Sequence, residues 1–163
     1  MEVASDGTVP KPLTGTDEAV LDSKGRLLLS KKKRDRLGDS FAIGIGAIGC
    51  LVAYPREIWQ RMLAEIDRFP TINSGRQSYT RLMLGQAEDE LECDAQGRVV
   101  IPQKLRQASK LEQDVVLVGC GDRLEIWAKE EWRKFNEFPD YGKDRLKAIE
   151  RAHEQMLAWE KPR

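Results

Sequence analysis

Short apolar runs separated by turn residues predict a chain built mainly from short β-strands. The runs Phe41–Ile45 and Leu51–Tyr54 flank one glycine-containing turn, and Val115–Val118 and Leu124–Trp127 flank a second one. Paired apolar runs around such turns are typical of β-hairpins. These runs therefore predict one strand hairpin in each half of the chain.

A different spacing predicts the helices. Ile58, Met62 and Ile66 recur at the 3.6-residue period of an amphipathic helix. Ser30 and Ser74 are predicted N-caps. The predicted helices are Lys31–Leu37, Pro55–Phe69, Ser74–Gly85, Pro102–Ala108, Glu130–Phe138 and a last one striped by Leu146, Ile149, His153, Met156 and Leu157. The second and third are expected to bury their stripes against the core or a neighbouring subunit.

One motif occurs twice in the sequence. Leu21–Leu28 and Cys93–Val100 both read D-x-x-G-R followed by apolar residues, at an offset of 72 positions. With one residue of slippage, Leu51–Trp59 also matches Leu124–Trp132, aromatic on aromatic. Two copies are too few for a solenoid, which needs at least three. The repeat therefore predicts one closed unit made of two pseudo-symmetric halves.

Each motif copy is predicted to be a tight turn between two strands of a hairpin. Aspartate is favoured at the start of such a turn, and Gly25 and Gly97 can take a positive φ. Each half then reads β-β-α-β-β, and closing eight strands together would leave no exposed edge. We predict an α+β fold, mainly β, forming a pseudo-two-fold barrel with flanking helices. The predicted segments are an N-terminal extension (1–12), the first half (13–70), a linking helix with the second half (71–138) and a C-terminal helix (139–163).

Composition adds little that is specific. The 163 residues include 27 Lys and Arg and 27 Asp and Glu, so the net charge is zero. No apolar run reaches the ~18 residues of a membrane span, and the N-terminus lacks the apolar segment of a signal peptide. The three cysteines form no C-x-x-C pair. We expect a cytoplasmic protein without disulfides or zinc.

Positive charge is concentrated in one segment. Seven bases lie within thirteen residues, against the single acid Asp35. They are Lys24, Arg26, Lys31, Lys32, Lys33, Arg34 and Arg36. A local positive patch can hold nucleic-acid phosphate even on a neutral protein. The alternative is a solvated basic helix face without a ligand.

Residue types suited to catalysis are sparse. His153 is the only histidine and lies on a predicted helix stripe. Cys50, Cys93 and Cys120 have no histidine or metal-ligand spacing beside them, so each is predicted to be a small buried side chain. We expect no catalytic residue, no metal and no cofactor, and do not expect an enzyme.

In order and spacing, these features resemble the MraZ family, which has the AbrB-like swapped-hairpin fold. The resemblance covers about Leu13 to Phe138 and is carried by D-x-x-G-R at 22–26 and 94–98, Arg81–Ala87, Ile101–Arg106 and Leu124–Trp127. It implies a swapped-hairpin β-barrel. It also implies a bacterial, cytoplasmic, nucleoid-associated transcriptional regulator that binds double-stranded DNA. The targets would be promoter direct repeats of the division and cell-wall gene cluster, bound by a ring-shaped homo-oligomer of about eight or more subunits.

The same resemblance implies that both motif turns face DNA. The DNA-facing residues that it implies are Asp22, Lys24, Arg26, Asp94 and Arg98. From turn chemistry, Asp22, Gly25, Asp94 and Gly97 are expected to position the turns rather than to contact DNA. From their charge, the basic residues Lys31, Lys32, Lys33 and Arg34 are also expected to bind DNA. The planar fork of arginine suits phosphate or a guanine edge. Because the second copy has Gln96 in place of Lys24, the first turn is expected to supply more affinity.

Two alternatives to these assignments stay open. The Asp–Arg pairs could be buried structural pairs that hold the barrel together. The protein could also be a structural or partner-binding ring without specific DNA recognition.

The sequence departs from the family pattern in two places. Ser30 stands where the family has a proline, followed directly by three lysines, which adds positive charge and leaves the pose of the basic helix open. About a dozen extra residues precede the first strand. They could form an arm that enters the minor groove or have no role in DNA binding, and we favour no role.

Overall fold

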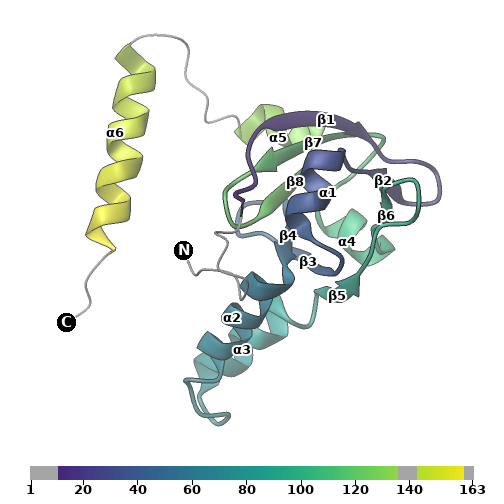
Figure 1. Ribbon diagram of the computed structural model, residues 1–163. Coiled ribbons are helices and arrows are strands. Elements are labelled where there is room, and N and C mark those ends of the chain that lie inside the picture. Colours follow the sequence, from purple (N-terminus) through teal and green to yellow (C-terminus); the bar gives the residue numbers. More distant parts are fainter. Residues whose placement is uncertain (1–10, 136–142, 160–163) are drawn as a thin grey trace. The chain divides into compact units, whose positions relative to one another are not determined.

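The computed structural model describes residues 11–135 and 143–159 (Figure 1). The chain divides into two compact units, with the boundary between Trp132 and Arg133. The first half of the repeat contains β1 (Thr16–Val20), β2 (Arg26–Leu28), α1 (Lys31–Leu37), β3 (Phe41–Ile45) and β4 (Leu51–Pro55). The second contains β5 (Glu88–Leu91), β6 (Arg98–Val100), α4 (Gln103–Ala108), β7 (Asp114–Gly119) and β8 (Leu124–Ala128). The remaining helices are α2 (Arg56–Ile66), α3 (Ser74–Met83), α5 (Lys129–Phe135) and α6 (Lys143–Ala158).

The strands pair across the two halves. A six-stranded antiparallel sheet has the order β1-β7-β8-β4-β3-β5, and β2 pairs with β6 in a separate two-stranded sheet. Thus β1 of the first half lies on β7 of the second, while β5 of the second half lies on β3 of the first (Figure 1). The predicted α+β class with two repeated β-β-α-β-β halves is confirmed.

The predicted closure into one barrel is not found among the described strands. Strands β1 and β5 end the six-stranded sheet. The chain just after β1 meets β2 at the isolated bridge between Leu21 and Leu27 and through the bond from the Asp22 amide to the Arg26 carbonyl at 3.0 Å. Strands β2 and β6 have three residues each and pair with one another. The motif turn therefore does not join two strands of one hairpin, because the strand after each turn pairs with the other half.

A pseudo-two-fold axis relates the halves. In the β2–β6 sheet, called the ribbon below, Arg26 opposes Val100, Leu28 opposes Arg98 and Leu27 opposes Val99. Under the 72-residue offset this register is unchanged when the two strands are exchanged. The axis therefore passes between Leu27 and Val99, and it places the two motif turns in equivalent positions at opposite ends of the ribbon.

The core lies between the ribbon, helices α1 and α4, and the six-stranded sheet. Its cluster includes Leu27, Val99, Ile43, Leu51, Leu117 and Ile126, together with Leu37 of α1 and Leu105 of α4. Aromatic pairs repeat as the sequence match predicts. Tyr54 stacks on Trp59 with 5.8 Å between ring centroids, and Trp127 meets Trp132 edge-on at 5.4 Å.

Local residue chemistry sets the helix ends. The Ser30 hydroxyl accepts from the Lys33 amide at 3.4 Å, and α1 ends at Gly38, which has φ of 88°. In α3 the N-cap is Asn73, whose side chain accepts from the Arg76 amide at 2.9 Å, so the prediction that Ser74 is the cap is wrong by one residue. Asparagine is an equally good N-cap.

Several predicted helix ends differ from the structure by one to three residues. Helix α2 ends at Ile66, before the predicted end at Phe69. Helix α5 is described as far as Phe135, and the rest of its predicted range, 136–138, lies outside the described residues. The predicted segment boundaries stay predictions.

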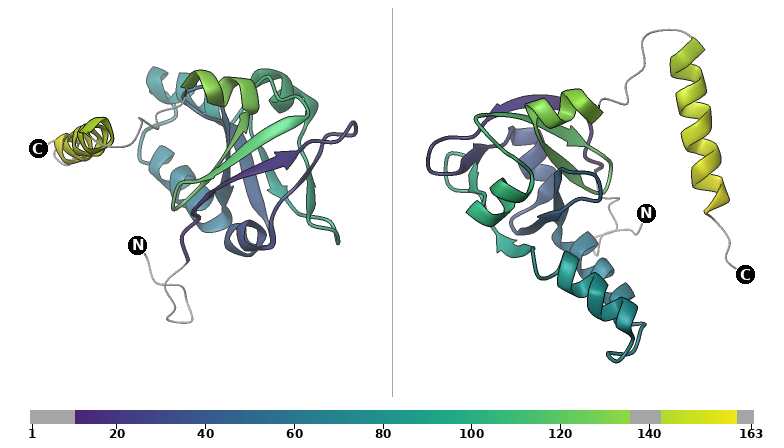
Figure 2. Two further views of the ribbon diagram at one scale, coloured as in Figure 1. Left: turned by 90° about the horizontal axis from the view of Figure 1, so that it is seen from above. Right: turned by 180° about the vertical axis from the view of Figure 1, so that it is seen from behind.

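Helices α2 and α3 form a pair that projects from the strands (Figure 2). Both are amphipathic, yet neither contains a buried residue. Phe69, Ile72, Tyr79 and Leu82 are exposed on or between them. Their apolar stripe therefore lies outside the core of this chain. Among the described residues, no helix combines the length and apolarity of a membrane span.

Candidate nucleic-acid interface

The first motif turn, Asp22–Arg26, is closed by its aspartate. Asp22 Oδ1 accepts from the amides of Lys24 and Arg26, both at 2.9 Å, and Oδ2 accepts from Arg26 Nε at 2.6 Å. The Gly25 amide donates to the Asp22 carbonyl at 3.0 Å, with φ of 78° at Gly25. The predicted tight turn, begun by an aspartate and with glycine at a positive φ, is therefore present. Such a φ is accessible mainly to glycine.

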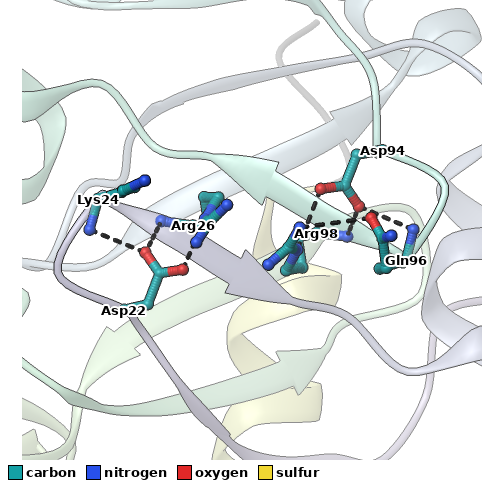
Figure 3. Close-up of polar contacts among 6 residues, drawn as sticks. All are labelled: Asp22, Lys24, Arg26, Asp94, Gln96 and Arg98. Carbon is teal, nitrogen blue, oxygen red and sulfur yellow. Dashed lines mark hydrogen bonds and ion pairs between the residues drawn. The ribbon is translucent and has the colours of Figure 1, made fainter.

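The second motif turn, Asp94–Arg98, repeats this geometry (Figure 3). Asp94 Oδ1 accepts from the amides of Gln96 and Arg98 at 3.0 and 2.9 Å, and Oδ2 accepts from Arg98 Nε at 3.0 Å. Gly97 has φ of 84°. One contact has no counterpart in the first turn: Arg98 Nη2 donates to Gln96 Oε1 at 3.3 Å.

Neither Asp–Arg pair is buried. Side-chain exposure is 32% for Arg26 and 34% for Asp22, and 31% for Arg98 and 38% for Asp94. The alternative in which the Asp–Arg pairs are buried structural pairs therefore does not agree with the structure. Each aspartate fixes the Nε edge of its arginine and leaves the guanidinium partly open to solvent.

Hydrogen bonds keep both aspartates ionised. The Arg26 amide is the largest cause that lowers the pKa of Asp22 below its usual 3.8, and burial opposes it. The Arg98 amide does the same for the pKa of Asp94. A carboxylate that accepts several N–H bonds is stabilised in its charged form. At neutral pH both turns are therefore held by carboxylates.

The ribbon joins the two turns into one surface. The Leu29 amide donates to the Gly97 carbonyl at 3.0 Å, and the Ile101 amide donates to the Gly25 carbonyl at 2.8 Å. Side chains opposite one another on antiparallel strands point to the same face. Arg26, Leu28, Arg98 and Val100 therefore share the ribbon's outer face, where Leu28 and Val100 are exposed.

The basic segment is only partly available on the surface. Lys24 and Lys32 are exposed, and Lys31 is exposed while paired with Asp35 at 2.9 Å. Lys33 is 2% exposed, and its Nζ donates to Asp17 at 2.5 Å and to the Thr14 carbonyl at 3.1 Å. The prediction that Lys33 contacts DNA is therefore wrong, because its ammonium group lies inside and holds the chain around β1.

Arg34 and Arg106 lie against the motif glycines. A β-carbon built on Gly97 would be 2.6 Å from Arg34 Cζ, and one built on Gly25 would be 2.9 Å from Arg106 Cζ. Sequence reasoning included Arg34 but not Arg106 among the site residues. The 72-residue offset, which relates these two arginines, was the signal that identifies it.

Burial disfavours the reactive thiolate form of the cysteines. Cys50 is buried as predicted, whereas Cys93 and Cys120 are half-buried. Burial raises the pKa of the Cys50 thiol to about 12, so it is a thiol at neutral pH. Burial also raises the pKa of Cys93, although Arg34 opposes that shift. Within residues 11–135 and 143–159, no three His, Cys, Asp or Glu side chains cluster as metal ligands would.

Comparison with known proteins identifies similar sequences over most of this chain. The family model described as "MraZ protein, putative antitoxin-like" matches residues 13–81 and 83–140. The transcriptional regulator MraZ of Lactiplantibacillus plantarum is 44% identical over 121 residues, which is 74% of this chain and 85% of that protein. The one from Heliobacterium modesticaldum is 38% identical over 123 residues, 76% and 85% respectively. The one from Lachnoclostridium phytofermentans is 41% identical over 113 residues, 69% and 79%. The family model includes both motif turns and ends before α6.

Proposed function

Since this chain belongs to the MraZ family, we propose that it regulates transcription by binding double-stranded DNA through its two motif turns. The observation that carries the proposal is the placement of two aspartate-fixed, partly exposed arginines on the outer face of one ribbon. A two-stranded ribbon fits the major groove. The two turns are therefore proposed to enter DNA together.

The hydrogen-bond pattern suggests how each arginine would read DNA. Asp22 binds the Nε edge of Arg26, and the two η nitrogens have no partner among the described residues. Those nitrogens form the fork that binds a guanine edge or a phosphate bidentately. Arg98 has one η nitrogen occupied by Gln96. With Lys24 beside it, the first turn is proposed to supply more affinity than the second.

The finer parts of the function follow from the family resemblance. The protein is proposed to act in the cytoplasm, associated with the nucleoid, on promoter direct repeats of the division and cell-wall gene cluster. It is proposed to assemble as a ring of about eight or more copies. A groove of about 500 Å³ on the α2–α3 pair is proposed to receive a second copy. Its lining combines the apolar side chains of Met62, Ile66, Phe69 and Tyr79 with the polar ones of Glu65, Asn73 and Arg76.

The test is binding to DNA from upstream of the protein's own gene, measured across a range of salt concentrations. A scrambled duplex of equal length is the control. Preference for the native repeats supports a sequence-specific regulator. Equal binding to both duplexes, or none at low salt, would reject it in favour of the structural or partner-binding ring. The salt dependence separates phosphate attraction from base recognition.

A further inference from the structure

Two arginines outside the D-x-x-G-R motifs reach from one half of the repeat to the other. Arg34 follows β2 in helix α1, yet its guanidinium lies on Gly97 of the second turn. Arg106 follows β6 in helix α4, and its guanidinium lies on Gly25 of the first turn. The two residues are 72 positions apart, as are the two glycines. The pseudo-two-fold axis therefore relates two equivalent contacts that cross between the halves.

Both guanidinium groups lie face-on against their glycine. From a β-carbon built on Gly25, the Cζ, Nε and Nη2 atoms of Arg106 would be 2.9, 3.0 and 3.1 Å away. From one built on Gly97, the Cζ, Nε and Nη1 atoms of Arg34 would be 2.6, 2.7 and 2.8 Å away. Three nearly equal distances indicate a flat group stacked on the backbone. No residue with a β-carbon fits there without moving the arginine.

Hydrogen bonds connect this stacking to the ribbon. Arg106 Nε donates to the Ile101 carbonyl at 3.0 Å, and the Ile101 amide donates to the Gly25 carbonyl at 2.8 Å. Arg106 thus contacts both Gly25 of the first turn and Ile101, the residue after β6, which are themselves hydrogen-bonded to each other. Arg34 Nε is buried and has no hydrogen-bond partner within the described part of the chain, so the contact with Gly97 lacks the hydrogen bond that Arg106 Nε makes beside Gly25.

We propose that Arg34 and Arg106 are positioning residues for DNA recognition, which fix the two motif turns relative to each other by crossed stacking on Gly97 and Gly25. This inference rests on the proposed function. Two recognition turns on one ribbon contact base edges together with higher affinity when their separation is fixed before binding, since ordering them during binding would cost affinity. The planar guanidinium stacks in this way, whereas the compact ammonium group of lysine does not.

The decisive variants keep the positive charge and replace the planar guanidinium with an ammonium group. Arg106→Lys and Arg34→Lys each are expected to lower the preference for native over scrambled DNA about tenfold, comparable with one mismatched base pair. Affinity for the scrambled duplex at low salt is expected to stay within about twofold, because that binding depends on charge. The matched control is Arg123→Lys. Arg123 lies in the β7–β8 turn, which pairs with Leu13 before the start of β1, whereas Asp22 follows the end of β1. It should behave as the wild type.

A second measurement tests the positioning without DNA. Amide hydrogen exchange reports local opening, so Arg106→Lys should speed exchange at the Ile101 amide and Arg34→Lys at the Leu29 amide. Each amide is expected to exchange about tenfold faster, with core amides such as Leu117 unchanged. Unchanged exchange, or an equal loss of affinity for both duplexes, would overturn the positioning role. If the wild-type protein shows no preference for native over scrambled DNA, the proposed function is overturned instead. Amide hydrogen exchange alone would then decide whether Arg34 and Arg106 fix the two motif turns relative to each other.

Discussion

Within each motif turn, the aspartate and the arginine have different roles. Asp22 accepts three hydrogen bonds from its own turn, while the Arg26 side chain uses only Nε within the described part of the chain. The carboxylate therefore shapes the turn and the guanidinium is available to a ligand. This division is the same in the second turn, apart from the contact between Arg98 and Gln96.

Replacing Arg26 separates recognition from stability. Arg26→Ala is expected to weaken binding to the native DNA at least about tenfold, the size of losing one good bidentate contact. The melting temperature should hardly change, because a partly exposed ion pair contributes little to folding. Arg123→Ala is the matched control for loss of one partly exposed arginine. A large fall in melting temperature with unchanged affinity would return the Asp–Arg pair to a structural role.

The lowered pKa values of the aspartates predict a pH dependence of stability. Because the folded pKa of Asp22 lies below the usual 3.8, its stabilising effect is fully present above about that pH. It is lost as the pH falls through the folded pKa. The melting temperatures of wild type and Asp22→Asn should therefore differ at neutral pH and converge in strong acid. Asp39→Asn, at an exposed aspartate outside the motif, is the control for the loss of one negative charge. A constant difference for Asp22→Asn would contradict the prediction.

Among the elements, those defined by neighbouring residues could be predicted from the sequence. Helix α1 runs from Lys31 to Leu37 as predicted, because Ser30 and Gly38 provide its ends. The pairing of β2 with β6 could not be predicted in this way. Turn chemistry closes Asp22 on Arg26, but it does not decide whether the following strand pairs with the preceding one or with the other half.

The burial of Lys33 also escaped prediction, for a physical reason. In a seven-residue helix only one face meets the core, and here that face carries Lys33 and Leu37. A run of three lysines gives no indication which of them turns inward. The partner, Asp17, lies on β1, and the contact depends on the fold rather than on neighbouring residues.

Substitution of the adjacent lysines Lys33 and Lys32 should therefore affect different properties, namely folding stability for Lys33 and the salt dependence of DNA binding for Lys32. Lys33→Ala is expected to lower the free energy of unfolding by about 1–3 kcal/mol, because it leaves the Thr14 carbonyl and Asp17 without their donor. Lys32→Ala should leave urea denaturation unchanged but reduce the slope of log affinity against log salt by up to about 0.9. Each variant is the control for the other. Equal effects of the two on stability would contradict the assignment.

Over the whole molecule, the repeated sequence predicted two equivalent halves, and the structure adds that strands of each half pair with strands of the other. The 72-residue offset relates Arg106 to Arg34, but the sequence alone could not reveal that Arg106 lies against Gly25, because that contact crosses the pseudo-two-fold axis. Nor could it decide where the apolar stripes of α2 and α3 lie, since burial in the core and burial against another copy require the same helical pattern.

The exposed stripe leads to a prediction about assembly. If copies associate through the α2–α3 pair, Phe69→Asp and Tyr79→Asp should each reduce the mass measured by light scattering, because a charge would be buried against an apolar face. Repeated weak contacts gain avidity when several sites bind together. The same variants should therefore lose affinity for DNA with several repeats while keeping it for a single repeat.

The control for that experiment is Ile48→Asp, which places a charge at another exposed apolar residue, in the β3–β4 turn. Its mass and its binding to both DNAs should match the wild type. Because the net charge of the chain is zero, a single copy has little general attraction for DNA, and assembly would supply the affinity that charge does not. Unchanged mass in both Phe69→Asp and Tyr79→Asp would mean that copies do not associate through α2–α3.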